Sequence, residues 1–161
     1  MRDRFIILLG SFFYVGYLPL VPGTFGSIAG LAVFFIIKNS VMWYCIGTLG
    51  FILFGFLSSG AAERIIGKKD PRYIVIDEVS GMLLSLAFLP HDARVVVCAF
   101  VIFRLLDTFK PYPAGRLQNL KGSLGIMSDD LIAALYTRRC RRKVTVSPVV
   151  YATLLHKLPA R

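Results

Sequence analysis

Apolar segments follow one another along most of the chain, and charged residues are confined to the short breaks between them. Of the 161 residues, 56% are hydrophobic and only 17% are charged, which is more apolar than an ordinary soluble domain. This pattern predicts an all-α fold: a small polytopic helical membrane bundle with about four spans plus interfacial helices. The apolar runs behind this prediction are residues 5–20, 25–37, 41–57, 74–89 and 93–109.

The runs differ in how well they suit a membrane. Residues 41–57 form the clearest span, whereas residues 5–20 contain Gly10, Gly16 and Pro19 and are expected to lie against the membrane or dip into it. The run at residues 25–37 contains several small residues. They predict a helix face that packs closely against another helix, and they are Gly26, Ser27, Ala29 and Gly30.

The length suits a single domain over residues 1–161. Within it we expect a motif core at 16–135 and a basic tail at 138–161. A last helix should begin near Asp129, because Ser128 is a suitable N-cap and acidic residues suit a first helical turn. It should end before the basic cluster that opens the tail.

The net charge of +10 limits the class of partner. Because the basic residues flank apolar segments, they indicate anionic membrane lipids and an anionic substrate rather than nucleic acid. The turns near Lys38 and His91 carry few cations, whereas residues 63–72, 110–128 and 138–143 carry many. The positive-inside rule places the basic segments in the cytoplasm. With four spans, all the acidic motifs then fall on that same side.

Acidic residues are scarce, and most lie where an apolar segment begins or ends. Asp77 and Glu78 begin one run, Asp107 is near the end of another, and Asp129 and Asp130 begin the last helix. Converging carboxylates lose their charge unless a cation joins them, and acids at membrane depth are costly unless they bind something. Mg²⁺ prefers oxygen ligands and keeps positions for water and phosphate. These five residues are therefore the predicted metal ligands and catalytic carboxylates.

Cations suited to phosphate lie beside the acids. Arg104 is three residues before Asp107, so the two share a helix face, and Lys110 follows at the helix end. Arginine offers a planar fork to phosphate and lysine a point charge. Thr24 and Ser27 lie at a predicted helix start, where free backbone N–H groups favour an anion. These four residues are the predicted substrate-binding groups.

Each feature also has a purely structural interpretation. Asp129 and Asp130 can be a charged helix start, and Arg104 with Asp107 can be a structural salt bridge. The three cysteines form no metal-binding or disulfide pattern, and Cys45 and Cys98 are expected to be buried in membrane helices. What favours the functional interpretation is that three acidic segments and several cations share one face of a small bundle.

At these residues the chain resembles the phosphatidylglycerophosphatase A family. The resemblance covers residues 16 to about 135 and keeps the order of four family motifs. In this sequence they are Gly16-x-x-Pro19-x-x-Pro22-Gly23-Thr24-x-Gly26-Ser27, Asp70-Pro71-x-x-Ile74-Val75-x-Asp77-Glu78-x-x-Gly81, Phe103-Arg104-x-x-Asp107-x-x-Lys110-Pro111-x-Pro113 and Gly125-Ile126-Met127-x-Asp129-Asp130.

The resemblance implies a Mg²⁺-dependent lipid phosphatase that converts phosphatidylglycerophosphate to phosphatidylglycerol and phosphate. It also implies a multi-pass protein of the bacterial inner membrane with its active site facing the cytoplasm. The sequence departs from the family pattern at Ser123, Tyr112 and Ala134, where the family usually has Gly, often Trp and often Gly, but no motif carboxylate or cation is missing.

Other functions stay open at this point. One is a related metal-dependent phosphohydrolase or phosphotransferase acting on another phosphate ester. The phosphotransferase would need a nucleotide-linked donor. Another is a non-enzymatic membrane protein that binds divalent cations, because intramembrane acids alone allow it. The oligomeric state is also open.

Overall fold

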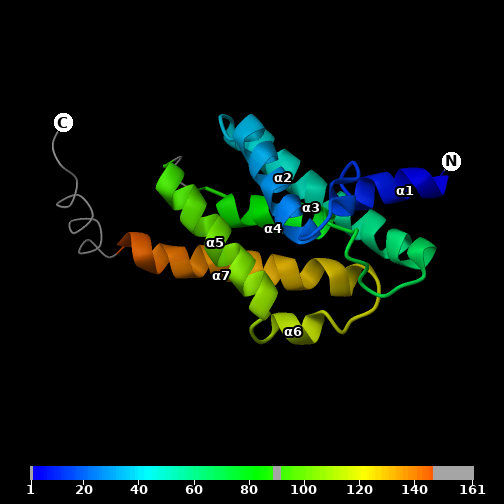
Figure 1. Ribbon diagram of the computed structural model, residues 1–161. Coiled ribbons are helices and arrows are strands. Elements are labelled where there is room, and N and C mark those ends of the chain that lie inside the picture. Colours follow the sequence, from blue (N-terminus) through cyan, green and yellow to red (C-terminus); the bar gives the residue numbers. More distant parts are fainter. Residues whose placement is uncertain (1, 89–91, 147–161) are drawn as a thin grey trace.

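The computed structural model describes residues 2–88 and 92–146, and those residues form helices and no strand (Figure 1). The all-α prediction is confirmed for this part of the chain. Residues 89–91 and the part of the basic tail from 147 to 161 lie outside the described residues. The elements are α1 (Arg2–Gly10), the short 3₁₀ helix η1 (Val15–Tyr17), α2 (Pro22–Ile37), α3 (Val41–Ile66), α4 (Ile76–Leu86), α5 (Ala93–Phe109), α6 (Ala114–Leu117) and α7 (Ser123–Val146).

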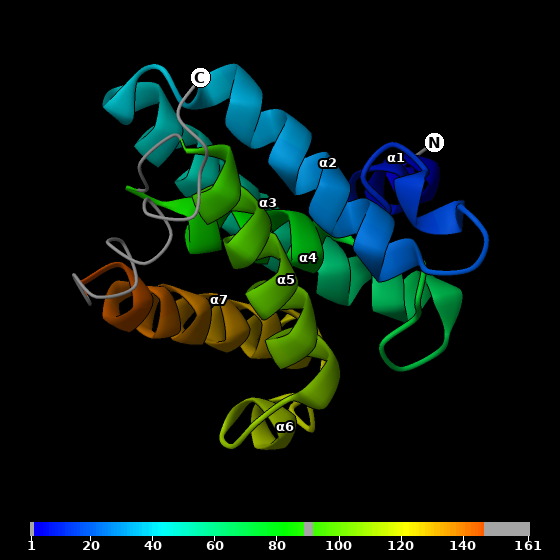
Figure 2. The ribbon, with the colours of Figure 1, turned by 60° about the vertical axis from the view of Figure 1, so that its left-hand side comes forward.

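Helix α4 lies at the centre of the bundle. It packs against α2, α3, α5 and α7, and Figure 2 shows it between α2 on one side and α7 on the other. Nine of its eleven residues are buried, as expected for a helix that is covered on all sides. The two acids in its first turn are therefore held inside the protein rather than on its surface.

Glycines of α2 allow the closest of these contacts. A Cβ atom added at Gly26 would lie 2.9 Å from the Cβ of Val75, and one added at Gly30 would lie 2.9 Å from the Cβ of Met82. The predicted small-residue face of α2 is thus confirmed, and its partner is α4. Close packing here brings the start of α2 against the acidic end of α4.

Helix α3 is longer than the predicted run at 41–57. The Ser40 side chain accepts a hydrogen bond from the backbone N–H of Trp43, and Gly67 ends the helix in the left-handed conformation with φ 71°. The helix therefore includes Glu63 and Arg64, which were expected in a loop. Among the described helices, α3 alone is both long and apolar enough to cross a membrane, so the number of spans stays a prediction.

The prediction for the last helix is wrong at both ends. The helix begins at Ser123 rather than near Asp129, and it continues to Val146, past Arg138. Its start is set by packing, because Ser123 lies against Gly60 of α3, where a side chain would collide with it. Ser128 is therefore inside the helix and caps nothing.

Large apolar side chains point outward along α3 and α5. The α3 residues are more than half exposed and repeat every three or four positions, so they form one stripe. They are Met42, Ile46, Leu49, Leu53 and Leu57, and on α5 Val97, Val101 and Leu105 form a similar stripe. Such stripes are unusual for a surface in water. The expectation that Cys45 and Cys98 are buried is wrong, since both are exposed.

Candidate active site

A pocket of about 490 Å³ opens where the loop before α2, the loop between α3 and α4, the first turn of α4, the end of α5 and α7 meet. Its volume is within the range of small-molecule sites. The sequence motifs that line it are far apart along the chain. The lining residues are Leu20, Val21, Pro22, Gly23, Asp70, Arg72, Ile74, Asp77, Glu78, Arg104, Asp107, Thr108, Lys110, Asp129 and Asp130.

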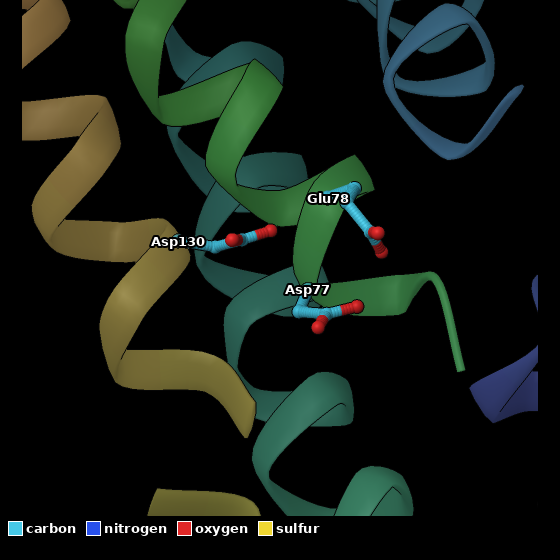
Figure 3. A group of neighbouring side chains, drawn as sticks. All are labelled: Asp77, Glu78 and Asp130. Atoms are coloured by element: carbon cyan, nitrogen blue, oxygen red, sulfur yellow. The ribbon is translucent and has the colours of Figure 1, made fainter. Parts of the chain in front are cut away.

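Asp77 and Glu78 enter the pocket from the first turn of α4, and Asp130 enters it from α7 (Figure 3). One carboxylate oxygen of each lies within 4.8 Å of one from each of the other two. Asp77 is 8% exposed and Asp130 only 2%. Three carboxyl groups are thus gathered around one small volume with little water access.

A second group of three carboxylates adjoins the first. Asp107, Asp129 and Asp130 also bring oxygens within 4.8 Å of one another, so Asp130 belongs to both groups. The backbone path explains the shared residue: α7 crosses α4 at Gly81, where an added Cβ would lie 3.2 Å from the carbonyl oxygen of Asp130. The absence of a side chain at Gly81 therefore leaves room for α7 to pack against α4.

Several of these oxygens are buried and have no hydrogen-bond partner among the residues that the structure describes. They are Oδ1 of Asp77, Oε2 of Glu78, Oδ1 of Asp129 and Oδ2 of Asp130. Buried polar atoms are almost always paired, so four orphaned oxygens in one pocket need an explanation. A bound divalent cation provides one, because hard cations such as Mg²⁺ take carboxylate oxygens as ligands. The donor set therefore fits such an ion.

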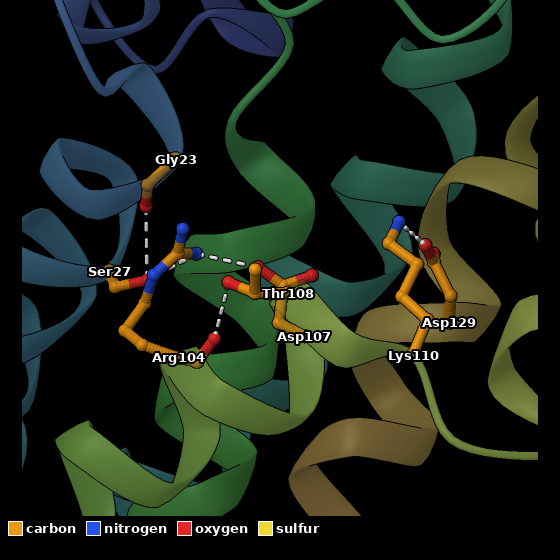
Figure 4. A network of polar contacts seen from close by, with 7 residues as sticks. All are labelled: Gly23, Ser27, Arg104, Asp107, Thr108, Lys110 and Asp129. Atoms are coloured by element: carbon orange, nitrogen blue, oxygen red, sulfur yellow. Dashed lines mark hydrogen bonds and ion pairs between the residues drawn. The ribbon is translucent and has the colours of Figure 1, made fainter.

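The two cations predicted beside the acids, Arg104 and Lys110, each form an ion pair with a carboxylate (Figure 4). Nη1 of Arg104 lies 2.7 Å from Oδ2 of Asp107, and it also donates to Oγ of Ser27 at 3.4 Å. Lys110 lies at the C-cap of α5 with a positive φ of 45°, and its Nζ donates to Oδ2 of Asp129. Each cation thus holds one carboxylate of the second group in place.

Gly23 keeps the wall of the pocket open beside these groups. A Cβ at this position would collide with Oε1 of Glu78 and would lie 3.2 Å from Nη2 of Arg104. Glycine allows the backbone of α2 to approach both side chains. Ser27, one turn further on, donates to the Gly23 carbonyl at 3.0 Å, so the start of α2 is tied to the arginine.

The electrostatics of the α7 carboxyl groups follow from their burial. Burial raises the pKa of Asp130 well above its usual value, and the nearby Asp107 and Glu78 raise it further. Burial also raises the pKa of Asp129, although Lys110 opposes that rise. A cation bound between these groups would favour their charged forms.

The predicted site residues are almost all brought together. The five acids, Arg104 and Lys110 line the pocket, and Ser27 reaches it through Arg104. Thr24 is not among the lining residues, and its backbone N–H donates to the Val21 carbonyl within a turn. The phosphate-binding role of Thr24 stays a prediction.

Sequence reasoning missed three polar residues of the pocket: Asp70, Arg72 and Thr108. Asp70 begins one of the family motifs, which was a usable signal, and its Oδ2 accepts a hydrogen bond from Gln118 at 2.9 Å. Arg72 was counted only as a basic loop residue. Its place at the pocket depends on how the loop between α3 and α4 folds back.

The family model and two of the relatives carry the same family name. The family model described as phosphatidylglycerophosphatase A matches residues 8–142. A phosphatidylglycerophosphatase A of Escherichia coli is 36% identical over 132 residues, covering 80% of this chain and 76% of the relative. The Haemophilus influenzae protein of the same name is 34% identical over 135 residues, covering 81% and 83%.

A third relative carries a different name. It is a putative phosphatidylinositol-3-phosphatase of Bacteroides thetaiotaomicron, 32% identical over 146 residues, which covers 84% of this chain and 91% of the relative. No solved structure gives a significant match.

Proposed function

Because the chain belongs to the phosphatidylglycerophosphatase A family and is a phosphatase, we propose that it removes the terminal phosphate of phosphatidylglycerophosphate with the help of Mg²⁺. The products are phosphatidylglycerol and inorganic phosphate. The observation that carries the proposal is the set of orphaned carboxylate oxygens beside two cations suited to phosphate.

Mg²⁺ would be held by Asp77, Glu78, Asp107, Asp129 and Asp130, whose oxygens form the two adjoining groups. When bound, the ion supplies charge neutralisation and polarises a phosphoryl oxygen. Because Asp130 belongs to both groups, a substitution at Asp130 would remove one carboxylate from each of them.

The chain's own cations orient the terminal phosphate. The Arg104 guanidinium has donors beyond those facing Asp107 and Ser27 and offers them to phosphate oxygens. Lys110 adds a point charge at the other side of Asp107 along α5. Both side chains are already positioned by carboxylates, so little side-chain freedom is lost on binding.

Hydrolysis also needs a proton acceptor. A water oxygen forms a bond to phosphorus as the bond from phosphorus to the glycerol oxygen breaks. The water proton passes to one of the pocket carboxylates that the ion leaves uncoordinated, and that carboxyl group gives a proton to the leaving glycerol oxygen.

The proposed location is the bacterial inner membrane, with several spans and the site facing the cytoplasm. The outward apolar stripes of α3 and α5 support a lipid-facing surface. The acids lie at the start of α4 and the end of α5 rather than in the middle of those helices. The basic residues near the site match the positive-inside rule.

The test is phosphate release from phosphatidylglycerophosphate in neutral detergent micelles, with Mg²⁺ or with EDTA. Release that requires Mg²⁺ is the expected result. Phosphatidylinositol 3-phosphate is the second substrate to assay, because of the name of the Bacteroides relative. Release from that lipid alone would replace the proposed substrate, and equal release in EDTA would overturn the metal assignment. A need for a nucleotide-linked donor would indicate a phosphotransferase.

A further inference from the structure

The pocket contains a third cation, and it differs from the other two. Arg104 is paired with Asp107 and Lys110 with Asp129. Arg72 lines the same pocket, is exposed, and has no hydrogen bond or ion pair among the described residues. Its acidic neighbour in sequence, Asp70, is held by Gln118 instead. Of the cations lining this pocket, Arg72 is thus the one that no carboxylate of the described residues holds.

Apolar residues line the pocket together with Arg72. Leu20 and Val21 belong to the loop between η1 and α2, and they are 92% and 52% exposed. Leu20 adopts a positive φ of 81°, a conformation that is uncommon for a leucine. A water-facing loop has no evident reason to hold a leucine in this way. Contact with an apolar ligand or an acyl chain would bury it.

The deep and outer parts of the pocket therefore differ in chemistry. The deep part combines acids with paired cations, which suits a metal and a terminal phosphate. The outer part combines a free guanidinium with exposed apolar side chains, which suits a group that is anionic and joined to hydrocarbon. A phospholipid that carries a terminal phosphate monoester and an internal phosphodiester offers both features in one molecule.

We propose that Arg72, with Leu20 and Val21 beside it, forms a subsite for the internal phosphodiester and adjoining glycerol of the substrate. The proposal rests on the proposed function, because it assumes that the terminal phosphate binds at Arg104 and Lys110. The subsite selects lipids with two phosphates over lipids that carry a single phosphate monoester. Arg72 binds substrate and takes no part in the chemical step.

The test compares Arg72→Gln with the wild type in neutral detergent micelles. Phosphatidylglycerophosphate has both phosphates and is the substrate. Phosphatidate has only the monoester and is used as a competitive inhibitor, which requires binding but no turnover. Arg72→Lys tests rescue by a conservative change, and Arg94→Gln is the matched control, since Arg94 lies at the far end of α5 and is also exposed.

For Arg72→Gln we expect a rise in KM for phosphatidylglycerophosphate of about tenfold, the size of one charge-assisted contact, with kcat unchanged. The inhibition constant of phosphatidate should not change. Arg72→Lys should recover part of the loss, and Arg94→Gln should behave as the wild type. Leu20→Ser should raise the same KM by a smaller factor.

Two results would overturn the subsite. An equal loss of affinity for both lipids would mean that Arg72 serves the terminal phosphate or the fold, and an unchanged KM would mean that it binds no part of the substrate. Failure of the proposed function looks different, because the wild type would then release no phosphate from phosphatidylglycerophosphate in the first place.

Discussion

At the scale of the residue, the site depends on carboxylates that the rest of the protein leaves without partners. A buried charge without a partner destabilises the folded protein, and a bound ligand of opposite charge offsets that destabilisation. Asp107 shows how the chain reduces that cost in part, because Arg104 neutralises it across one turn of α5. Asp130 is 2% exposed, and no cation of the described residues forms an ion pair with it. The two acids therefore depend on a bound ion to different degrees.

Asp107→Asn should lower the rate of phosphate release by at least about 100-fold, because it removes a charged ligand and the partner of Arg104. The measurement is kcat with saturating Mg²⁺, with helicity followed by circular dichroism. Asp92→Asn is the control on the same helix: Asp92 caps the start of α5 by accepting from the Arg94 N–H at 2.8 Å, and asparagine caps a helix equally well, so both stability and activity should stay close to those of the wild type. Full activity of Asp107→Asn would refute the site assignment.

The raised pKa of Asp130 and Asp129 predicts how stability depends on pH without metal. The folded protein holds protons on these groups that the unfolded chain releases near pH 4, so stability is present at low pH and falls as pH rises through the raised values. In EDTA, the melting temperature should fall as the pH rises above about 4.

Added Mg²⁺ should restore stability more at about pH 8 than at about pH 5, because it binds the charged carboxylates. Asp130→Asn should flatten the pH dependence in EDTA, since an amide cannot lose that proton. A melting temperature that Mg²⁺ leaves unchanged at both pH values would argue against a metal in this pocket.

At the scale of the element, the site depends on the distance between α2 and α4. Gly26 and Gly30 have no side chains, so the two helices approach closely enough for Gly23 to lie beside Glu78 and Arg104. A short, nearly fully buried α4 also needs partners on every side, and α2 is one of them. Packing of this pair therefore affects both stability and the site.

Gly30→Ala should destabilise the protein by about 1–3 kcal/mol, because the new Cβ would lie 2.9 Å from Met82 Cβ and from the Val79 carbonyl oxygen. The control is Gly50→Ala on α3, where an added Cβ meets no atom within 4 Å. That change should leave stability unchanged or raise it by up to about 1 kcal/mol, because alanine favours a helix. Thermal unfolding in detergent measures both variants, and equal effects would contradict the packing argument.

At the scale of the whole molecule, the outward apolar stripes indicate which surface of the protein contacts lipid. On α3, the most apolar long helix, the stripe runs from Met42 to Leu57, while its buried face carries small residues such as Gly55, Ser59 and Gly60. Small residues inside and large apolar residues outside are the reverse of a water-soluble helix and typical of helices in lipid. Lipid contact along α3 therefore accounts for both faces of the helix.

Leu53→Lys should impair membrane insertion, because a lysine near the centre of a span costs about 2.5–3.5 kcal/mol. Ile65→Lys, near the end of the same helix, should be tolerated, since its side chain can reach the interface. The measurement is the fraction of protein that stays in the membrane after alkaline extraction. If both variants stay in the membrane as the wild type does, α3 does not face lipid at Leu53.

The sequence by itself determined the helical class, the small-residue face of α2, the position of Asp77 and Glu78 at the start of α4 and that of Asp107 near the end of α5. These features depend on residues close together in the chain, where the helical repeat and end-capping preferences act. The family motifs added the enzyme class. Local preference also explains why the last helix was predicted to start too late. Ser128 before two acidic residues has the sequence pattern of a helix N-terminus.

Only the tertiary structure decided which groups meet. Asp130 belongs to two carboxylate groups because α7 crosses α4 at Gly81, and α7 begins at Ser123 because Gly60 of α3 leaves room there. Arg72 reaches the pocket because the loop after α3 folds back toward α2. Such contacts join segments tens of residues apart, so they depend on packing between helices, and no local preference encodes them.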